Sequence, residues 1–301
     1  VKRRGHVFSC RNNIFFHKSF LFACAKIRKK YFFQIKNILF ILKCLYLHLE
    51  TTESYRMQTL YVLAAALAPI VVLMLYVYFK DKQNPEPTGM LIKGLWFGVL
   101  STFLSLTISL PMTAVGLSPE VQTSFLDCLG VSFFGASIPE ELAKFFMFWL
   151  LIRKNKYFDE HLDGVVYAAS VALGFAALEN VLYLFDNLDD WVTVGITRAL
   201  LAVPMHCGCG ILMGYYYSLI HFNNNHSLWN KSLVLLVPIM IHGVYDTLLF
   251  YMQVAPELSI FLAIAVLWLC NKLRKRCSAR IAELMAMGMA IKRTDETEYK
   301  Y

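Results

Sequence analysis

The stretch DGVVYAASVALGFAALENVLYLF, residues 163–185, decides the fold. A helix needs about 20 apolar residues to cross a membrane, and this stretch is long enough to do so. Only Glu179 and Asn180 interrupt its apolar second half. A charged side chain at the bilayer centre costs about 2.5–3.5 kcal/mol on insertion scales, so such residues are seldom kept without a function. The stretch therefore predicts a membrane helix that carries functional side chains.

Six further stretches are also apolar and of spanning length. The seven expected spans cover residues 59–79, 91–111, 125–152, 163–185, 193–220, 232–251 and 257–271. The third and the fifth exceed 25 residues, which predicts tilted or kinked helices. The chain is 57% hydrophobic and 17% charged, whereas soluble domains carry about a quarter charged residues. We therefore expect an all-α polytopic membrane protein, a bundle of about seven transmembrane helices.

The basic residues indicate an orientation. From residue 80 onward, all of them except Lys144 and Arg198 lie in or beside one alternating set of loops and in the carboxyl-terminal segment, while the opposite loops 112–124, 186–192 and 252–256 carry none. Basic loops stay on the cytoplasmic side, so we expect a multi-pass cell-membrane protein with a cytoplasmic carboxyl terminus. This topology accounts for much of the net charge of +8, and we expect contact with the lipid bilayer but not with nucleic acid.

The first 56 residues differ from the rest and hold 12 of the 29 lysines and arginines. Lys36 and Lys43 break the apolar stretch 31–49, whereas Met57 opens a strong span at once. We predict that 1–56 is a basic extension outside the native protein, with an eighth, amino-terminal helix as the alternative. Residues 57–275 would then be the transmembrane domain and 276–301 a cytoplasmic tail.

Four polar clusters lie within the expected spans: Glu140-Glu141-Leu-Ala-Lys144, Glu179-Asn180, His206, and His242-Gly-Val-Tyr-Asp246. A rise of about 1.5 Å per residue places them in the middle and the outer half of the bilayer. Prolines precede three of the clusters, at positions 139, 204 and 238. Proline disturbs helical backbone, and irregular backbone at this depth is tolerated only inside protein or along a water-filled cavity. The clusters together predict a hydrated reaction site inside the bundle.

Three of the clusters also have a structural interpretation. Glu140 and Lys144 could be an ion pair, Asn180 an interhelical hydrogen bond, and His206 a packing residue. Four such clusters in one chain favour function over these readings. For Cys207 and Cys209 packing is the better interpretation, because residues two apart on a helix face different ways. Asp163 stands where a helix begins, a position that suits an acidic residue.

These motifs in this order resemble the PrsW family of membrane-embedded proteases, which is related to the CAAX-protease and bacteriocin-processing group. The matching residues are Glu140-Glu141-Leu-Ala-Lys144, Phe175-Ala-Ala-Leu-Glu179-Asn180, Arg198 through Pro204-Met-His206, and His242-Gly-Val-Tyr-Asp246. The resemblance implies an intramembrane peptidase that cuts membrane-anchored proteins, such as an anti-sigma factor in the best-known member. It also implies a glutamate-activated water, although members are also classed as metalloproteases.

We predict peptide-bond hydrolysis with Glu140 or Glu141 as the general base. Glu179 and His206 would position the water, and His242 would donate a hydrogen bond to the developing oxyanion. Four residues would support this site: Lys144 as the charge partner of the glutamates, Asn180 as a contact to the substrate backbone, Asp246 as the group that orients His242, and Arg198 as a possible partner of Glu179 or Asp246.

The residue pattern allows both a metal-dependent and a metal-free mechanism. Glu141, Glu179, His206 and His242 are the candidate ligands for a divalent ion such as zinc. The chain has no His-Glu-x-x-His motif, however, and metal-free glutamate chemistry is slightly favoured.

Two rival functions use similar residues. An ion- or proton-coupled transporter also has intramembrane carboxylates and broken helices, but it usually has inverted repeats, which this sequence lacks. A CAAX-type prenyl-protein endoprotease would be expected to end its second motif in histidine, whereas this chain has Glu179-Asn180.

Overall fold

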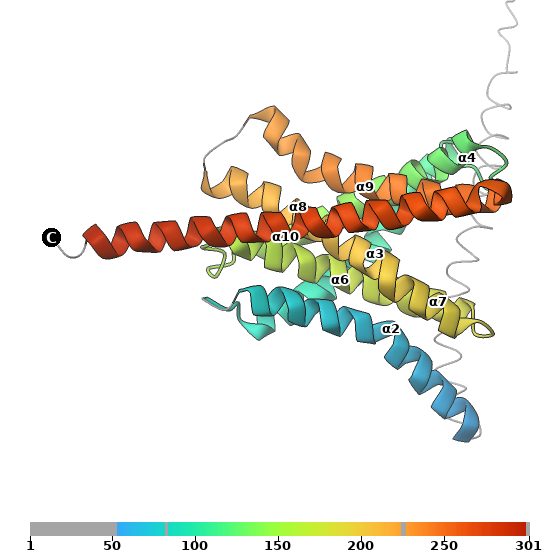
Figure 1. Cartoon of the computed structure of the whole chain (residues 1–301), viewed down its shortest axis with the longest axis horizontal. Helices are drawn as coiled ribbons and strands as arrows, with labels where there is room; N and C mark the ends of the chain where they lie inside the picture. Colours follow the sequence, from blue (N-terminus) through green and yellow to red (C-terminus); the bar gives the residue numbers. More distant parts are fainter. Residues whose placement is uncertain (1–52, 82–83, 224–226, 299–301) are drawn as a thin grey trace, which may run out of the picture.

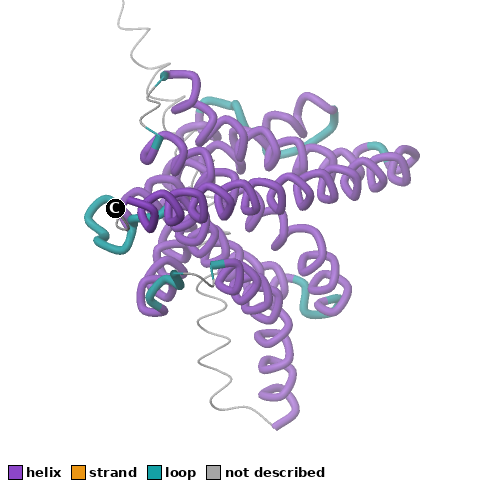
Figure 2. Tube along the Cα trace, turned by 60° about the vertical axis from the view of Figure 1, so that its left-hand side comes forward, coloured by secondary structure: helices purple, strands orange, loops and turns teal. Residues whose placement is uncertain are grey.

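The computed structural model describes residues 53–81, 84–223 and 227–298, and this part of the chain is helical without a strand (Figure 2). The helices are α2 (Glu53–Lys80), α3 (Thr88–Ala114), α4 (Phe125–Gly130), η1 (Val131–Ser137), α5 (Ile138–Ile152), α6 (His161–Asp186), α7 (Trp191–Thr197), η2 (Arg198–Ala202), α8 (Val203–Phe222), α9 (Leu228–Val254), η3 (Pro256–Leu258) and α10 (Ser259–Glu298). The predicted all-α fold is confirmed. The predictions for residues 1–52 lie outside the described residues.

The chain crosses the bundle back and forth. Within the described residues, six helical segments are long and apolar enough to cross a membrane. Helices α4, η1 and α5 follow one another without a gap over the remaining expected span, residues 125–152. Together these segments match the expected spans. The carboxyl ends of α2, α5 and α8 lie on the same side as the carboxyl terminus, at the left of Figure 1.

The two longest expected spans both contain a π-helical turn. The seven-residue turn η1 leads directly into α5 with Pro139 in its first turn, and η2 leads into α8 with Pro204 in the same position. A proline ring clashes with the carbonyl four residues earlier, and the wider π turn relieves this clash. The expected irregularity of the third and fifth spans is therefore confirmed, while α9 continues through Pro238 as one α-helix.

Helix α6 is the centre of the bundle. In its most apolar stretch 72% of the residues are buried, against 33% in α3 and in α9. Glycines allow its neighbours to approach closely: a Cβ added at Gly210 of α8 would lie 2.6 Å from the Cβ of Ala172. Gly174 of α6 likewise faces the backbone of Leu95 in α3. This packing holds the polar segment of α6 between α3 and α8.

Helix α10 runs along the length of the bundle (Figure 1). It continues without a break past residue 275, where we expected a tail to begin. Ile281 and Leu284 are buried in the main hydrophobic core, and Tyr215 of α8 donates a hydrogen bond to Glu283 at 2.9 Å. The segment from 276 to at least 284 is thus packed on the bundle.

Candidate active site

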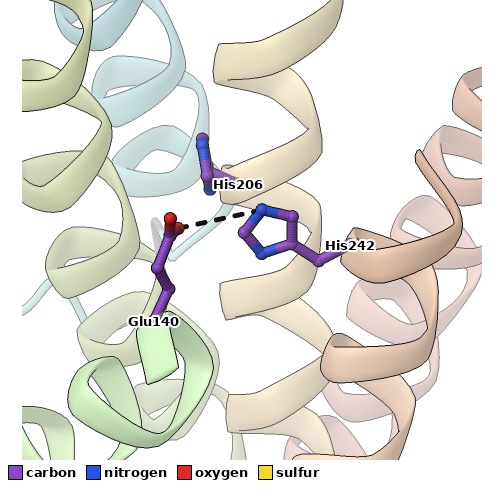
Figure 3. Close-up of side chains that lie close together, drawn as sticks. All are labelled: Glu140, His206 and His242. Carbon is purple, nitrogen blue, oxygen red and sulfur yellow. Dashed lines mark ion pairs between the residues drawn. The ribbon is translucent and has the colours of Figure 1, made fainter. Parts of the chain in front are cut away.

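Three side chains from three different spans converge at one point. Figure 3 shows Glu140 of α5, His206 of α8 and His242 of α9 turned toward one another. One ligand atom of each lies within 4.8 Å of the other two. The π turns precede two of these residues by a few positions, so they lie where α5 and α8 resume regular geometry.

The acidic pair shares one lysine. Lys144 Nζ lies 2.8 Å from Glu141 Oε1 and 3.4 Å from Glu140 Oε2. It also lies 3.9 Å from the centre of the Phe175 ring, a position that favours a cation. Glu141 is fully buried, whereas the side chain of Glu140 is 16% exposed. Glu141 is therefore the structural partner of the lysine, and Glu140 is the accessible member of the pair.

The His206 ring is held from both sides. Its Nδ1 lies 3.1 Å from Lys144 Nζ, and its Nε2 lies 2.8 Å from Glu179 Oε2. An ammonium group has only donors and a carboxylate only acceptors. His206 therefore accepts at Nδ1 and donates from Nε2, which assigns its tautomer.

Carboxylates surround the His242 ring. Its Nδ1 lies 2.9 Å from Glu141 Oε1, while its Nε2 lies 3.2 Å from Asp246 Oδ2 and 3.7 Å from Glu140 Oε2. Nδ1 donates its hydrogen bond to Glu141, and Asp246, which we expected to orient this ring, lies beside Nε2. Because carboxylates only accept, a neutral His242 satisfies one side alone. The Nε2 side therefore requires a second proton or a bound cation.

Arg198 joins α6 to the π turn η2. Its Nη2 lies 2.8 Å from Glu179 Oε2, and its Nε donates to Asn180 Oδ1 at 2.7 Å. Asn180 Nδ2 in turn donates to the carbonyl of Ala66 in α2 at 2.8 Å. Asn180 is fully buried with both ends of its amide engaged, so it positions Arg198 and α2 rather than facing a substrate. Ala66 carries no sequence signal for this contact.

All nine predicted site residues belong to one connected network. The most accessible acidic side chains are Glu140, Glu179 and Asp246, at 16%, 19% and 15% exposure. With Glu141 there are four carboxylates, against two permanent cations, Lys144 and Arg198. Buried charges in proteins are paired or bind metals, and the four carboxylates exceed the two cations by two.

The residues fit a divalent metal. Two imidazoles and one carboxylate are the donor set of a catalytic zinc site with an open position. The grouping of Glu140 with His206 and His242 differs from the predicted ligands, which included Glu141 and Glu179. Glu141 Oε1 is already engaged by both Lys144 and His242.

Comparison with known proteins agrees with this arrangement. The profile of a family described as "PrsW family intramembrane metalloprotease" matches residues 86–270, which include all four polar motifs. The chain belongs to the PrsW family. It is an intramembrane protease and a multi-pass membrane protein, as its fold and the resemblance of its motifs predicted.

Named bacterial relatives of this family align over most of their length. The Protease PrsW of Geobacillus kaustophilus is 37% identical over 192 residues, which cover 62% of this chain and 79% of that protein. Those of Oceanobacillus iheyensis and Bacillus subtilis are each 35% identical and are covered to 82% by 62% of this chain. No solved structure matches the chain.

Proposed function

We propose that this PrsW-family protease hydrolyses peptide bonds in membrane-anchored regulatory proteins, of the anti-sigma-factor kind, at the centre formed by Glu140, His206 and His242. The observation that carries the proposal is their convergence, within 4.8 Å, from three separate spans. A polar group at this depth is costly, so three that meet at one point favour chemistry over packing.

Glu140 is the group we assign to the attacking water. It is the accessible member of the acidic pair, and it lies 3.7 Å from His242 Nε2 on the face opposite the bond to Glu141. Glu141 is a positioning residue, since it holds both Lys144 and His242 and has no exposed surface. A carboxylate next to the water can accept its proton as the amide carbon is attacked.

The other residues hold this geometry. Glu141 directs His242 Nε2 toward Glu140, and Asp246 lies against the same nitrogen. His206 links the Lys144 side of the site to Glu179. Arg198 fixes Glu179, the most exposed carboxylate of the network, where it faces His206. The proton that Glu140 takes from the water would pass to the amine nitrogen as the C–N bond breaks.

We propose that the centre holds a divalent metal, zinc by its donor set. The excess of two negative charges and the unsatisfied side of His242 support this, as does the description of the family. His206 and His242 would each offer a nitrogen, and His206 would give up one of its two hydrogen bonds. Glu140 would offer one carboxylate oxygen to the ion and keep the other for the water. Such an ion lowers the pKa of a bound water to about 7 and polarises a carbonyl.

We propose that the carboxyl terminus and the basic loops face the cytoplasm. The positively charged ends of α5 and α10 lie on one side of the bundle, which is consistent with the charge asymmetry of the loops. Labelling of a cysteine introduced near the carboxyl terminus, before and after the cells are opened, tests this. Labelling in intact cells would contradict it.

Comparison of membrane proteomes tests the function. An uncut precursor should accumulate in cells that lack the protein and in cells that carry the Glu140→Gln variant. It should not accumulate in cells with the wild-type protein. Glu120→Gln, in an exposed loop, is the matched control and should behave as wild type. A precursor processed normally in Glu140→Gln cells, with the variant inserted, would refute the assignment.

A further inference from the structure

A second group of carboxylates lies at the other end of the bundle. Asp81 directly follows α2, Glu86 precedes α3, and Asp163 is in the first turn of α6. The carboxyl end of α2 and the amino end of α6 lie on the side of the carboxyl terminus (Figure 1). One oxygen of each carboxylate lies within 4.8 Å of the other two. Their exposed fractions are 2%, 4% and 0%.

Only one of the two carboxylate oxygens of Asp163 has a described hydrogen-bond donor. Oδ2 accepts hydrogen bonds from the backbone amides of Asp159 and Glu160, at 2.8 and 2.6 Å, which is the helix-capping role that its position predicts. Oδ1 is buried and accepts no hydrogen bond among the described residues. One oxygen of this carboxylate lies within 4.8 Å of an oxygen of Glu86. Two carboxylates so close need a positive species between them.

Glu86 has one identified donor. The hydroxyl of Tyr167, one helical turn beyond Asp163 in α6, donates to Glu86 Oε2. In the part of the chain that the structure describes, no lysine, arginine or histidine lies within ion-pair distance of Glu86 or Asp163. The protein thus brings acidic oxygens together here without supplying a described cation of its own to either residue.

We propose that Asp81, Glu86 and Asp163 bind a hard divalent cation of the Mg²⁺ class. Carboxylate oxygens are the ligands that Mg²⁺ and Ca²⁺ prefer, whereas zinc prefers nitrogen and sulfur. Asp163 is fully buried, and its Oδ1, which takes no part in the helix cap and accepts no hydrogen bond from a described residue, is the oxygen that would bind the ion. The ion ties the end of α2, at Asp81, and the residue Glu86 before α3 to the start of the central helix α6. This site is distinct from the candidate active site and does not depend on its function.

The competing occupant is a proton. Burial, followed by the charges of Asp163 and Asp81, raises the pKa of Glu86 to about 9, although the hydrogen bond from Tyr167 opposes this shift. A Glu86 that is neutral could donate to Asp163 without any metal. Glutamine would replace a protonated glutamate well but would be a poor ligand for a divalent cation, so one substitution separates the two occupants.

Binding of Mn²⁺, a paramagnetic substitute for Mg²⁺, tests the proposal. The full chain is purified in detergent, stripped with chelator and titrated while free Mn²⁺ is followed by electron paramagnetic resonance. The titration uses the His242→Ala background, which lacks one ligand of the candidate active site. We expect one Mn²⁺ per chain, displaced by Mg²⁺, and at least about tenfold weaker binding after Glu86→Gln or Asp163→Asn, as expected for loss of a charged ligand.

Glu120→Gln is the matched control for Glu86→Gln, and it should leave Mn²⁺ binding unchanged. The proposal is overturned if the unsubstituted site binds no Mn²⁺, or if Glu86→Gln binds it as tightly. Thermal stability identifies a proton as the occupant if two results coincide. Mg²⁺ would raise the melting temperature of neither the parent nor Glu86→Gln, and Glu86→Gln would be at least as stable as the metal-free parent. The titration of the parent protein decides the question even if Asp163→Asn does not fold.

Discussion

The two carboxylate clusters of this protease differ in how their charge is balanced. At the candidate active site, Lys144 and Arg198 lie among the acidic groups, Lys144 at 2.8 Å from Glu141 and Arg198 at 2.8 Å from Glu179. In the cluster of Asp81, Glu86 and Asp163, the structure describes no basic side chain within ion-pair distance of the last two. Internal cations balance part of the charge of the first cluster, whereas Glu86 and Asp163 have no described cation beside them and would need a proton or an ion from outside.

The two clusters also differ in whether a carboxylate is accessible for a reaction. The internal cations fix Glu141 and Glu179, and this leaves Glu140 accessible beside two oriented imidazoles. The second cluster has no imidazole and no such accessible group, since all three of its carboxylates are at most 4% exposed. We therefore expect hydrolysis at the first and a structural role at the second.

The largest expected effect separates the clusters by activity. Glu140→Gln removes the group assigned to the water and should lower the rate of cleavage by about 100- to 10,000-fold, the usual contribution of a general base. Glu86→Gln should keep most of the activity of the inserted protein. The measurement is the rate of cleavage of a purified substrate in liposomes. Equal losses of cleavage rate in the two variants would contradict the assignment of hydrolysis to one cluster and a structural role to the other.

Removal of metal should also distinguish them. Stripping zinc with 1,10-phenanthroline should abolish cleavage, and added Zn²⁺ but not Mg²⁺ should restore it, because the active-site donors include two imidazoles. The checks are the zinc content by mass spectrometry and the activity of the same sample. Full activity of a sample that contains no zinc would refute the metal and would leave Glu140 as a base in metal-free chemistry.

Replacement of the internal cation tests the charge balance directly. Lys144→Met leaves Glu140 and Glu141 without their partner, and breaking a buried pair in this way costs about 3–5 kcal/mol of stability. The measurement is the free energy of unfolding in mixed detergent and SDS. Lys272→Met, at an exposed position of α10, is the control and should change it little. A small loss in Lys144→Met would show that the glutamates are protonated instead.

The smallest of these effects concerns Arg198. Lysine at this position cannot donate at the same time to Asn180 and to Glu179 with the geometry of a guanidinium. Loss of one hydrogen bond to a charged group should cost about 1.5–3 kcal/mol in the same unfolding assay. Cleavage should fall as well, because Glu179 loses its fixed position. An Arg198→Lys variant with wild-type stability and activity would remove Arg198 from the account.

The sequence predicted much of the fold and the nine residues that the structure brings into one polar network. The lengths of the apolar stretches predicted where the spans lie. The third and fifth stretches exceed 25 residues and contain Pro139 and Pro204, which indicated the irregular helices that the structure shows as η1 and η2. The spacing of four residues between His242 and Asp246 correctly predicted that they are neighbours, at 3.2 Å.

Contacts between helices could not be read from spacing. The hydrogen bond from His242 to Glu141 joins positions 101 residues apart, and that from Asn180 to Ala66 joins positions 114 apart. Rotation of each helix about its axis decides such pairs, and the π turns change that rotation within two of the spans. The same reason explains Asp163: its place at a helix start was evident, but its approach to Glu86 depends on how α3 packs on α6.

Two substitutions at once test the central claim most directly. If Glu140 and His242 act in one hydrolytic centre, the Glu140→Gln/His242→Ala double variant should cleave a reconstituted substrate no more slowly than the slower single variant, since residues that act as a unit are not additive. Effects of the two substitutions that multiply, in variants that insert and fold alike, would contradict the claim and place the two residues in separate functions.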